Sequence, residues 1–222
     1  MDVKLIRVYG SDDVVVDAAR VSFSKLSSNY TEEQNAKLIK YLADHEHWSP
    51  FAHIFVQMKE KVPIFVARQR FKHRVGFEYN EVSRRYVDDP PEFFYPEVWR
   101  GRPFNAKQGS SDEVIKKVIM RNNVECWESE TDNIYQLHVE ACEHTYRSFI
   151  EAGVAPEQAR MVLPQSLYTE YYCTGSLAAW ARAYKLRSDP HAQKEIQDLA
   201  AMWNDIISGI TELQFSWKAL TQ

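Results

Sequence analysis

Cationic and hydrogen-bonding side chains gather between Arg68 and Arg85, in the stretch RQRFKHRVGFEYNEVSRR. Six Lys and Arg residues fall within these eighteen positions, although the whole chain carries a formal net charge of -4. Arginine matches the geometry of phosphate and carboxylate groups, and serine and asparagine add directional hydrogen bonds. This basic segment therefore indicates a specific anionic ligand, while a solvated basic loop would give the same charge density.

The residue types of the basic segment suit a phosphorylated ligand. A nucleotide monophosphate needs cations for its phosphate and neutral donors and acceptors for its sugar and base, and Gln69 to Arg85 offer both. Arg160 lies in an expected short helix, and Arg187 comes just before a helix that we expect to begin at Asp189 and Pro190. The residues alone predict a nucleotide-like ligand and leave the reaction open.

Other sites find less support in the spacing of the residues. Ser83 could be a nucleophile with His73 as its base, but two such residues ten positions apart are weak support. His45, Glu46 and His47 do not make the HExxH pattern of a metal site, and we predict no metal. No GxGxxG or GxxxxGK[ST] motif is present. A nucleic-acid-binding protein that uses the basic segment is the rival class, and the negative net charge opposes it.

Composition favours one globular domain. The chain has 222 residues, of which 45% are hydrophobic, and no apolar run long enough to cross a membrane. No secretory signal is visible at the N-terminus. The three cysteines are scattered and form no CxxC, which favours a reducing compartment. We expect a single cytoplasmic domain over 1–222 that binds neither membrane nor nucleic acid; for a viral protein the compartment would be the host cytoplasm.

Hydrophobic periodicity predicts an α+β fold with a central, mostly antiparallel sheet flanked by helices. The expected strands are Val3 to Tyr9, Phe51 to Lys59 and Tyr168 to Thr174. The expected helices are Asp13 to Ser22, one from Thr31 to Trp48, Pro63 to Gln69, a broken helical region from Ser110 to Ala152, Pro156 to Pro164, Leu177 to Leu186 and Asp189 to Leu213. Asp88 to Pro103 is expected to be an ordered loop, and Asn122-Asn123 and Glu128 to Asn133 to break the helical region.

Local patterns add detail to these elements. Thr31 with Gln34 and Ser110 with Glu113 form capping-box patterns, and Leu38, Ile39 and Leu42 supply an apolar stripe. Ala52, Ile54, Val56 and Met58 share one face of the strand from Phe51, and Gln57 and Lys59 lie mainly on the other. Gly76 permits a turn or a close backbone approach, Gly153 is an expected helix stop, and His191 is expected in the first turn of the last helix.

Several segments in order resemble the flavin-dependent thymidylate synthase family. PIFVARQRFKHRVGFEYNEVSRRY is similar to the family signature of Arg-His-Arg, seven residues, then Ser. Four further segments match in the family's order: AARVSF at Ala18, HEHWSPFAH at His45, ARMVLPQSLYTEYY at Ala159 and LRSDPHAQKEIQ at Leu186. The resemblance covers about residues 15 to 100 and 150 to 215.

The chain departs from the family pattern at several places. Lys72 replaces the first Arg of the triplet, and eight residues separate Arg74 from Ser83. Ser176 and Arg182 stand where family members often carry Asn. Residues near 101–132 look like a family-specific insertion, to which the resemblance assigns no role.

The resemblance implies an enzyme that makes dTMP from dUMP. Methylenetetrahydrofolate would donate the carbon, and NADPH would reduce the FAD cofactor; no protein cysteine attacks the pyrimidine in this family. The family is a homotetramer in which each active site is shared between subunits, around a central sheet flanked by helices.

The resemblance also implies roles for individual residues. Arg187 would contact the uracil and favour its ionised form, as the catalytic residue. The dUMP contacts would be Gln69, Arg70, Lys72, Glu81, Ser83, Arg85, Arg160 and Arg187, of which Glu81, Ser83 and Arg85 would come from a neighbouring subunit. The flavin contacts would be Ser49, Lys72, His73, Arg74, Glu81, Ser176 and Arg182, with His47 and His191 as further candidates.

Overall fold

The computed structural model describes residues 1–86, 89–104, 109–122 and 124–222. The chain divides into two compact units. The first comprises Met1–Lys61, Arg68–Glu81 and Glu170–Gln222, and the second comprises Val62–Ala67 and Val82–Thr169.

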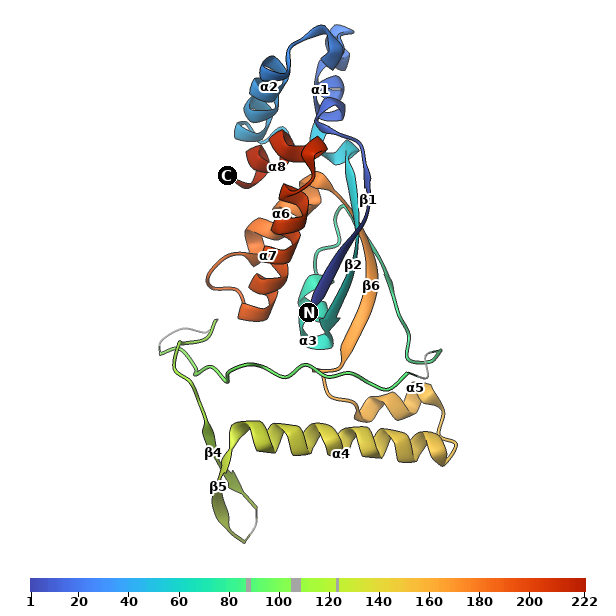
Figure 1. The fold of residues 1–222 in the computed structure, drawn as a ribbon, viewed down its shortest axis with the longest axis vertical. Helices are drawn as coiled ribbons and strands as arrows, with labels where there is room; N and C mark the ends of the chain where they lie inside the picture. Colours follow the sequence, from blue (N-terminus) through green and yellow to red (C-terminus); the bar gives the residue numbers. More distant parts are fainter. Residues whose placement is uncertain (87–88, 105–108, 123) are drawn as a thin grey trace. The chain divides into compact units, whose positions relative to one another are not determined.

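The main sheet has four strands in the order β1-β2-β6-β3 (Figure 1). These are β1 (Asp2–Tyr9), β2 (Phe55–Pro63), β3 (Phe77–Glu81) and β6 (Tyr168–Ser176). β1 pairs with β2, and β3 pairs with β6, both antiparallel. The predicted α+β class with an antiparallel sheet is confirmed. β3 lies inside the basic segment and was not predicted.

The two faces of β2 are as predicted, but the strand begins and ends at other residues than predicted. Val56, Met58, Glu60 and Val62 are buried, whereas Lys59 lies on the other face. The prediction of a strand from Phe51 is wrong, because residues Pro50–His53 form a short 3-10 helix. Pro63 was expected in a helix and instead ends the strand, where a residue without an N–H is tolerated.

The α-helices partly agree with the predicted spans. They are α1 (Asp12–Arg20), α2 (Glu32–Asp44), α3 (Ile64–Arg70), α4 (Thr131–Glu151), α5 (Pro156–Ala159), α6 (Leu177–Arg187), α7 (Lys194–Ser208) and α8 (Gln214–Thr221). Thr31 and Gln34 form the expected capping box at the start of α2. Gly153, with a φ of 84°, follows α4 as the expected helix stop.

Two helix predictions are wrong. The predicted last helix, Asp189 to Leu213, begins at Lys194 instead, because the Asp189 carboxylate accepts a hydrogen bond from the His191 amide (2.7 Å) and closes a turn. It ends at Ser208, and α8 follows it as a separate helix. The region after Ser110 forms a hairpin of β4 (Lys117–Arg121) and β5 (Cys126–Glu130) before α4 begins. Asp88, the start of the predicted loop, and Asn123, part of the predicted helix break, lie outside the described residues.

The core of the first unit lies between the sheet and the helices α6 and α7, which cover one face of it (Figure 1). Trp180 of α6 and Trp203 of α7 are fully buried and meet edge to face, with ring centroids 5.4 Å apart. The Trp180 indole N–H also donates to the Val56 carbonyl of β2 (3.0 Å). These contacts fix α6, and with it Arg187 at its C-terminal end, against the sheet.

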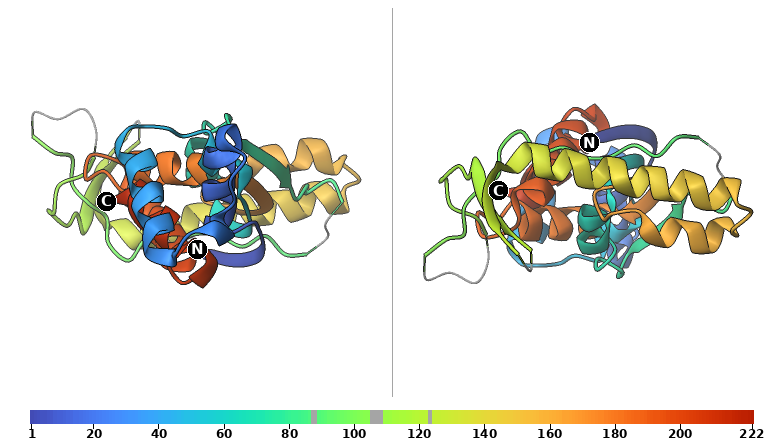
Figure 2. Two further views of the ribbon diagram at one scale, coloured as in Figure 1. Left: turned by 90° about the horizontal axis from the view of Figure 1, so that it is seen from above. Right: turned by 90° about the horizontal axis from the view of Figure 1, so that it is seen from below.

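In the second unit, α4 is a long helix with α5 packed beside it, as both views of Figure 2 show. Asn122 turns the β4–β5 hairpin, since its side-chain oxygen accepts from the amides of Val124 and Glu125 (both 2.8 Å).

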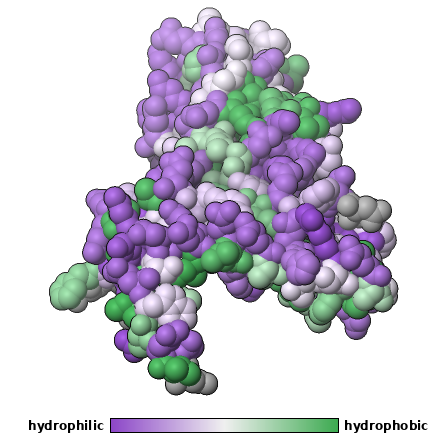
Figure 3. All heavy atoms as spheres, turned by 60° about the horizontal axis from the view of Figure 1, so that its bottom comes forward, coloured by the Kyte–Doolittle hydropathy of each residue, from purple (hydrophilic) through white to green (hydrophobic). Residues whose placement is uncertain are grey.

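Hydrophilic residues cover most of the face drawn in Figure 3, and hydrophobic residues form separate patches on it. None of the helices in the described part of the chain is long and apolar enough to span a bilayer.

Candidate active site

The candidate site begins where α3 ends and the chain turns into β3. Residues 71–76, here called the KHR turn, carry Lys72, His73 and Arg74. The Lys72 and His73 amides donate to the carbonyls of Gln69 and Arg70 (3.2 and 3.1 Å), so the turn continues directly from the last residues of α3. Lys72 and Arg74 are exposed, whereas His73 is buried. The turn therefore presents two cations to solvent on either side of an inward-facing imidazole.

Gly76 allows this turn to approach α6 closely. Its φ is 79°, and a Cβ at this position would lie 2.9 Å from the Ala179 Cβ and 3.1 Å from the Ser176 Oγ. Its carbonyl accepts from the Ser176 amide (3.0 Å). Only glycine satisfies both the backbone conformation and the contact without strain, which confirms the expected close backbone approach.

His73 and Arg187 meet although they are 114 positions apart in the chain. The Arg187 Nε donates to the His73 Nε2 (2.8 Å), and the Arg187 Nη2 donates to the Gln69 carbonyl (3.4 Å). Within the described residues, the Arg187 Nη1 donates no hydrogen bond, and the side chain is only half-buried. A guanidinium has five N–H donors, so Arg187 keeps donors for a ligand.

Burial and neighbouring cations decide the charge of His73. Burial, followed by the positive charges of Arg187, Arg70 and Arg182, lowers the pKa of His73 to about 4. The imidazole is therefore neutral at pH 7, and its Nε2 can accept the bond from Arg187 only if the ring proton is on Nδ1. Burial and the charge of Arg70 lower the pKa of Arg187, which nevertheless stays charged at pH 7.

Three further predicted residues adjoin the KHR turn. Arg182 of α6 is exposed and donates to the carbonyl of Val75. Ser176 is buried and caps α6, where its Oγ accepts from the Ala179 amide (3.3 Å). Gln69 is half-buried, and its amide donates to the Gln193 side chain (2.5 Å). Gln69, His73, Arg182, Ser176 and Arg187 are thus brought together around one turn.

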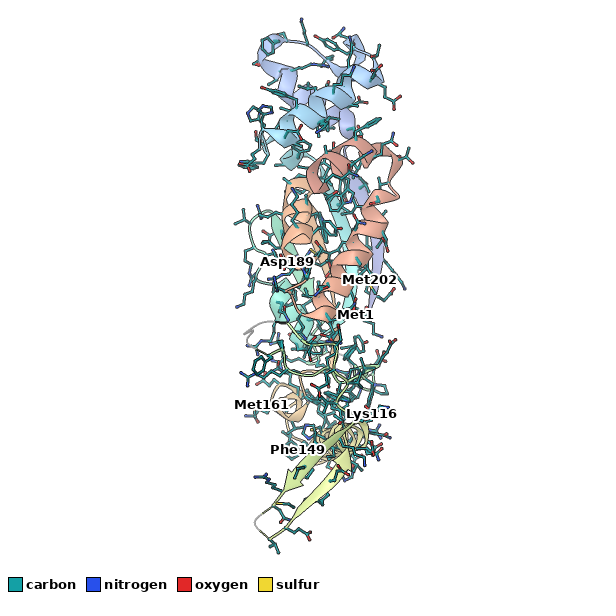
Figure 4. All side chains as sticks on the ribbon, turned by 90° about the vertical axis from the view of Figure 1, so that its left-hand side faces the viewer. Met1, Lys116, Phe149, Met161, Asp189 and Met202 are labelled. Carbon is teal, nitrogen blue, oxygen red and sulfur yellow. The ribbon has the colours of Figure 1, made fainter. Side chains whose placement is uncertain are left out.

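Other predicted residues of the first unit lie elsewhere on it. His191 was expected in the first turn of the last helix, and that prediction is wrong: it is exposed in the loop between α6 and α7, two residues after Asp189, which Figure 4 labels. Ser49 and His47 are exposed in the segment that follows α2, and the His47 ring lies edge-on to Tyr41 (centroids 6.3 Å apart). Glu81 ends β3, opposite Tyr171 of β6.

Ser83, Arg85 and Arg160 belong to the second unit. The Arg85 Nε donates to the Ser83 Oγ (3.2 Å), so these two residues of the signature contact each other. Arg160 is exposed, and its Nε donates to the Glu157 carbonyl (3.4 Å).

The predicted contact between Arg70 and dUMP is wrong. Arg70 was expected to hold dUMP, but its side chain has no exposed surface and cannot touch a ligand. The guanidinium lies among the rings of Phe77, Trp180 and Trp203, with its Cζ 4.3–4.7 Å from their centroids. Arg70 is therefore a core residue.

Comparisons with known proteins identify the family of the chain. Residues 4–211 match the Thy1 family, described as thymidylate synthase complementing protein. The chain belongs to the flavin-dependent thymidylate synthase family. It is 39% identical over 197 residues to the flavin-dependent thymidylate synthase of Thermosipho africanus, covering 89% of this chain and 81% of that protein. It is 35% identical to that of Thermus thermophilus, covering 99% and 75%.

A solved structure also resembles this thymidylate synthase family member along its whole length. It is the UMP/dUMP methylase PolB from Streptomyces cacaoi bound with 5-Br dUMP, which superposes with a TM-score of 0.80 at 28% identity. The match covers 99% of this chain and 94% of the methylase.

Sequence reasoning missed the residues that surround Arg70 in this family member. The Glu60 carboxylate pairs with the Arg70 Nε (3.3 Å), and the Arg70 Nη2 lies 3.0 Å from the Cys173 sulfur. Burial lowers the pKa of Arg70, but the charge of Glu60 and the neighbouring groups raise it above its usual value overall. The burial of Glu60 could have been predicted from the sequence. The alternation of β2 places Glu60 on the same buried face as Val56 and Met58.

Proposed function

We propose that this protein makes dTMP from dUMP as a flavin-dependent thymidylate synthase, with FAD as cofactor, methylenetetrahydrofolate as carbon donor and NADPH as reductant. Its membership of the family supports the activity. The observation that carries the proposal is the pairing of His73 with Arg187 beside an exposed Lys72. This pairing gives the family signature and a distant arginine one common location in the first unit.

Arg187 is the proposed catalytic residue. A charged guanidinium beside the uracil ring stabilises negative charge on that ring, and fixed donors act strongly where water is excluded. The Gln69 carbonyl accepts from Arg187, and Lys72 precedes His73 in the KHR turn, so both residues would hold the nucleotide near Arg187. Glu81, Ser83, Arg85 and Arg160 complete the proposed dUMP contacts. We propose that Glu81, Ser83 and Arg85 act from a neighbouring subunit of a homotetramer.

The residues of the KHR turn fit a flavin nucleotide. Its diphosphate needs cations that are accessible, and Lys72, Arg74 and Arg182 are all exposed around the neutral His73. Ser176, Glu81, Ser49, His47 and His191 are the further proposed contacts. When bound, the flavin supplies the redox chemistry, while the protein supplies orientation and charge.

The surroundings of Cys173 are consistent with a reaction in which no cysteine thiolate attacks the pyrimidine. Cys173 lies on β6 beside Arg70, and burial raises the pKa of its thiol far above neutrality. It therefore carries no thiolate at pH 7. Cys126 and Cys142 belong to β5 and α4 of the second unit.

A dTMP-forming assay tests the proposal. Purified protein reconstituted with FAD should be yellow, and with NADPH and methylenetetrahydrofolate it should convert dUMP to dTMP. NADPH oxidation should depend on dUMP or speed up with it. Protein that binds no flavin, or that binds dUMP and oligonucleotides but forms no dTMP, would instead point to a nucleotide- or nucleic-acid-binding protein without turnover.

A further inference from the structure

A chain of polar contacts leads from the buried interior of the first unit to Arg187. It begins at Tyr171 of β6, whose hydroxyl donates to the Glu60 carboxylate (2.6 Å). Glu60 pairs with the Arg70 Nε (3.3 Å), and neither of these two side chains has any exposed surface. Because a buried charge is stable only when it is paired and hydrogen-bonded, these contacts fix the Arg70 guanidinium in one position.

Tyr79 of β3 continues the chain of contacts toward the KHR turn. The Arg70 Nη1 donates to the Tyr79 oxygen (2.6 Å), and the Tyr79 hydroxyl donates to the His73 carbonyl (2.8 Å). Burial raises the pKa of Tyr79 well above its usual value, so the phenol stays protonated and remains a donor. The ring itself is packed edge to face against Phe71 and Tyr171 (centroids 5.0 and 6.0 Å away).

His73 contacts both the half-buried Tyr79 and the proposed ligand-binding residue Arg187. Its backbone carbonyl is held by Tyr79, and its Nε2 accepts from the Arg187 Nε (2.8 Å). A shift of the His73 backbone would therefore move the acceptor that orients Arg187. The donors that Arg187 keeps for a ligand would move with it.

Resting on the proposed function, we propose that Tyr79 and Arg70 are positioning residues, and that they aim Arg187 at the nucleotide through His73. Neither touches the ligand in this arrangement. Arg70 fixes the Tyr79 hydroxyl, Tyr79 fixes the His73 backbone, and the neutral His73 ring holds the Nε edge of Arg187. The opposite edge of the guanidinium is thereby directed away from His73, where a uracil ring can accept its hydrogen bonds.

We call the path from Arg70 through Tyr79 and His73 to Arg187 the relay. A double-mutant cycle on dUMP affinity tests it. Tyr79→Phe removes one hydroxyl and keeps the packed ring, and we expect it to weaken dUMP binding roughly fivefold to twentyfold. Arg187→Ala should weaken it more. The double variant should bind dUMP within about twofold of Arg187→Ala alone, because Tyr79 has nothing left to position. Additive losses, or unchanged dUMP affinity in Tyr79→Phe, would overturn the relay.

Tyr135→Phe is the matched control. The Tyr135 hydroxyl also donates to a backbone carbonyl, that of Phe94 (2.6 Å), but Tyr135 lies on α4 outside the proposed site. It should lose a similar amount of stability and bind dUMP as the wild type does. A comparable loss of dUMP affinity in both variants would assign the effect of Tyr79 to general destabilisation and overturn the relay.

The tautomer of His73 gives a second readout that does not depend on how the variants fold. The ¹⁵N chemical shifts of the wild-type imidazole at pH 7 should show an unprotonated Nε2 and a protonated Nδ1. A proton on Nε2 would exclude the bond from Arg187 and overturn the relay. Wild-type protein that binds no dUMP would contradict the proposed function itself, so the two failures are distinguishable.

Discussion

Arg187→Ala should abolish most dTMP formation while the protein keeps its fold and its flavin. The loss expected in kcat/KM is about 100- to 1000-fold, the range found when one fixed donor to a developing negative charge is removed. The fold should survive because Arg187 is the last residue of α6 and only half-buried, and its two bonds join it to His73 and to the Gln69 carbonyl.

Lys185→Ala provides the control for this result. Lys185 lies in the same last turn of α6 and is exposed. Its removal takes the same charge from the same helix end, so a general effect of charge would appear in both variants. Steady-state dTMP formation and flavin absorbance should be measured on the two proteins side by side. Near-normal turnover of Arg187→Ala would remove Arg187 from its proposed role.

Glu60→Gln should cost about 3–5 kcal/mol of folding free energy, because it leaves the Arg70 charge buried without its counterion. The side chains of Glu60 and Arg70 both have no exposed surface, so water cannot replace the lost partner. The Tyr171 hydroxyl would also lose its charged acceptor. The measurement is the free energy of unfolding from denaturant titration at pH 7.

Lys59, the residue before Glu60 in β2, provides the control for this loss of stability. Lys59 pairs with Glu170 on the opposite face of β2, where both side chains are more than a third exposed. Lys59→Ala should cost no more than about 1 kcal/mol, since solvent screens an exposed ion pair. If the two variants were equally stable, Glu60 and Arg70 would not form the buried ion pair that the structure shows.

Features that depend on residues close together in the sequence were predicted correctly. The Thr31–Gln34 capping box and the apolar stripe of α2 lie within a few residues of one another, and both are present as expected. A turn or close approach at Gly76 and a helix stop at Gly153 were predicted, and both glycines have a positive φ, which glycine adopts without strain.

The predictions failed where two local signals competed. The Ser110–Glu113 pattern suggested a helix, but Val118 and Ile119 are β-branched and pair across the hairpin with Ser129 and Glu128. Asp189-Pro190 looked like a helix start, but the Asp189 side chain closed a turn first. A short polar side chain such as that of Asp189 stabilises a turn as readily as it caps a helix.

The candidate site was predictable in its residue types and only partly in its geometry. The basic segment and Arg187 were singled out from the sequence, and the structure joins them at His73. The sequence could not distinguish Arg70 from its neighbours, because its burial depends on Trp180 and Trp203, more than one hundred positions away. A charge run thus contained one core residue among surface cations.

The central claim is that cations from distant parts of the chain meet on one pyrimidine nucleotide beside a flavin. A crystal structure of the assembled protein with FAD and dUMP measures this directly. We expect that Arg187 contacts the uracil while its Nε stays on His73, and that Lys72, Arg85 and Arg160 surround the same nucleotide within one chain or across a subunit contact. A nucleotide bound away from Arg187, with these cations on unrelated surfaces, would contradict it.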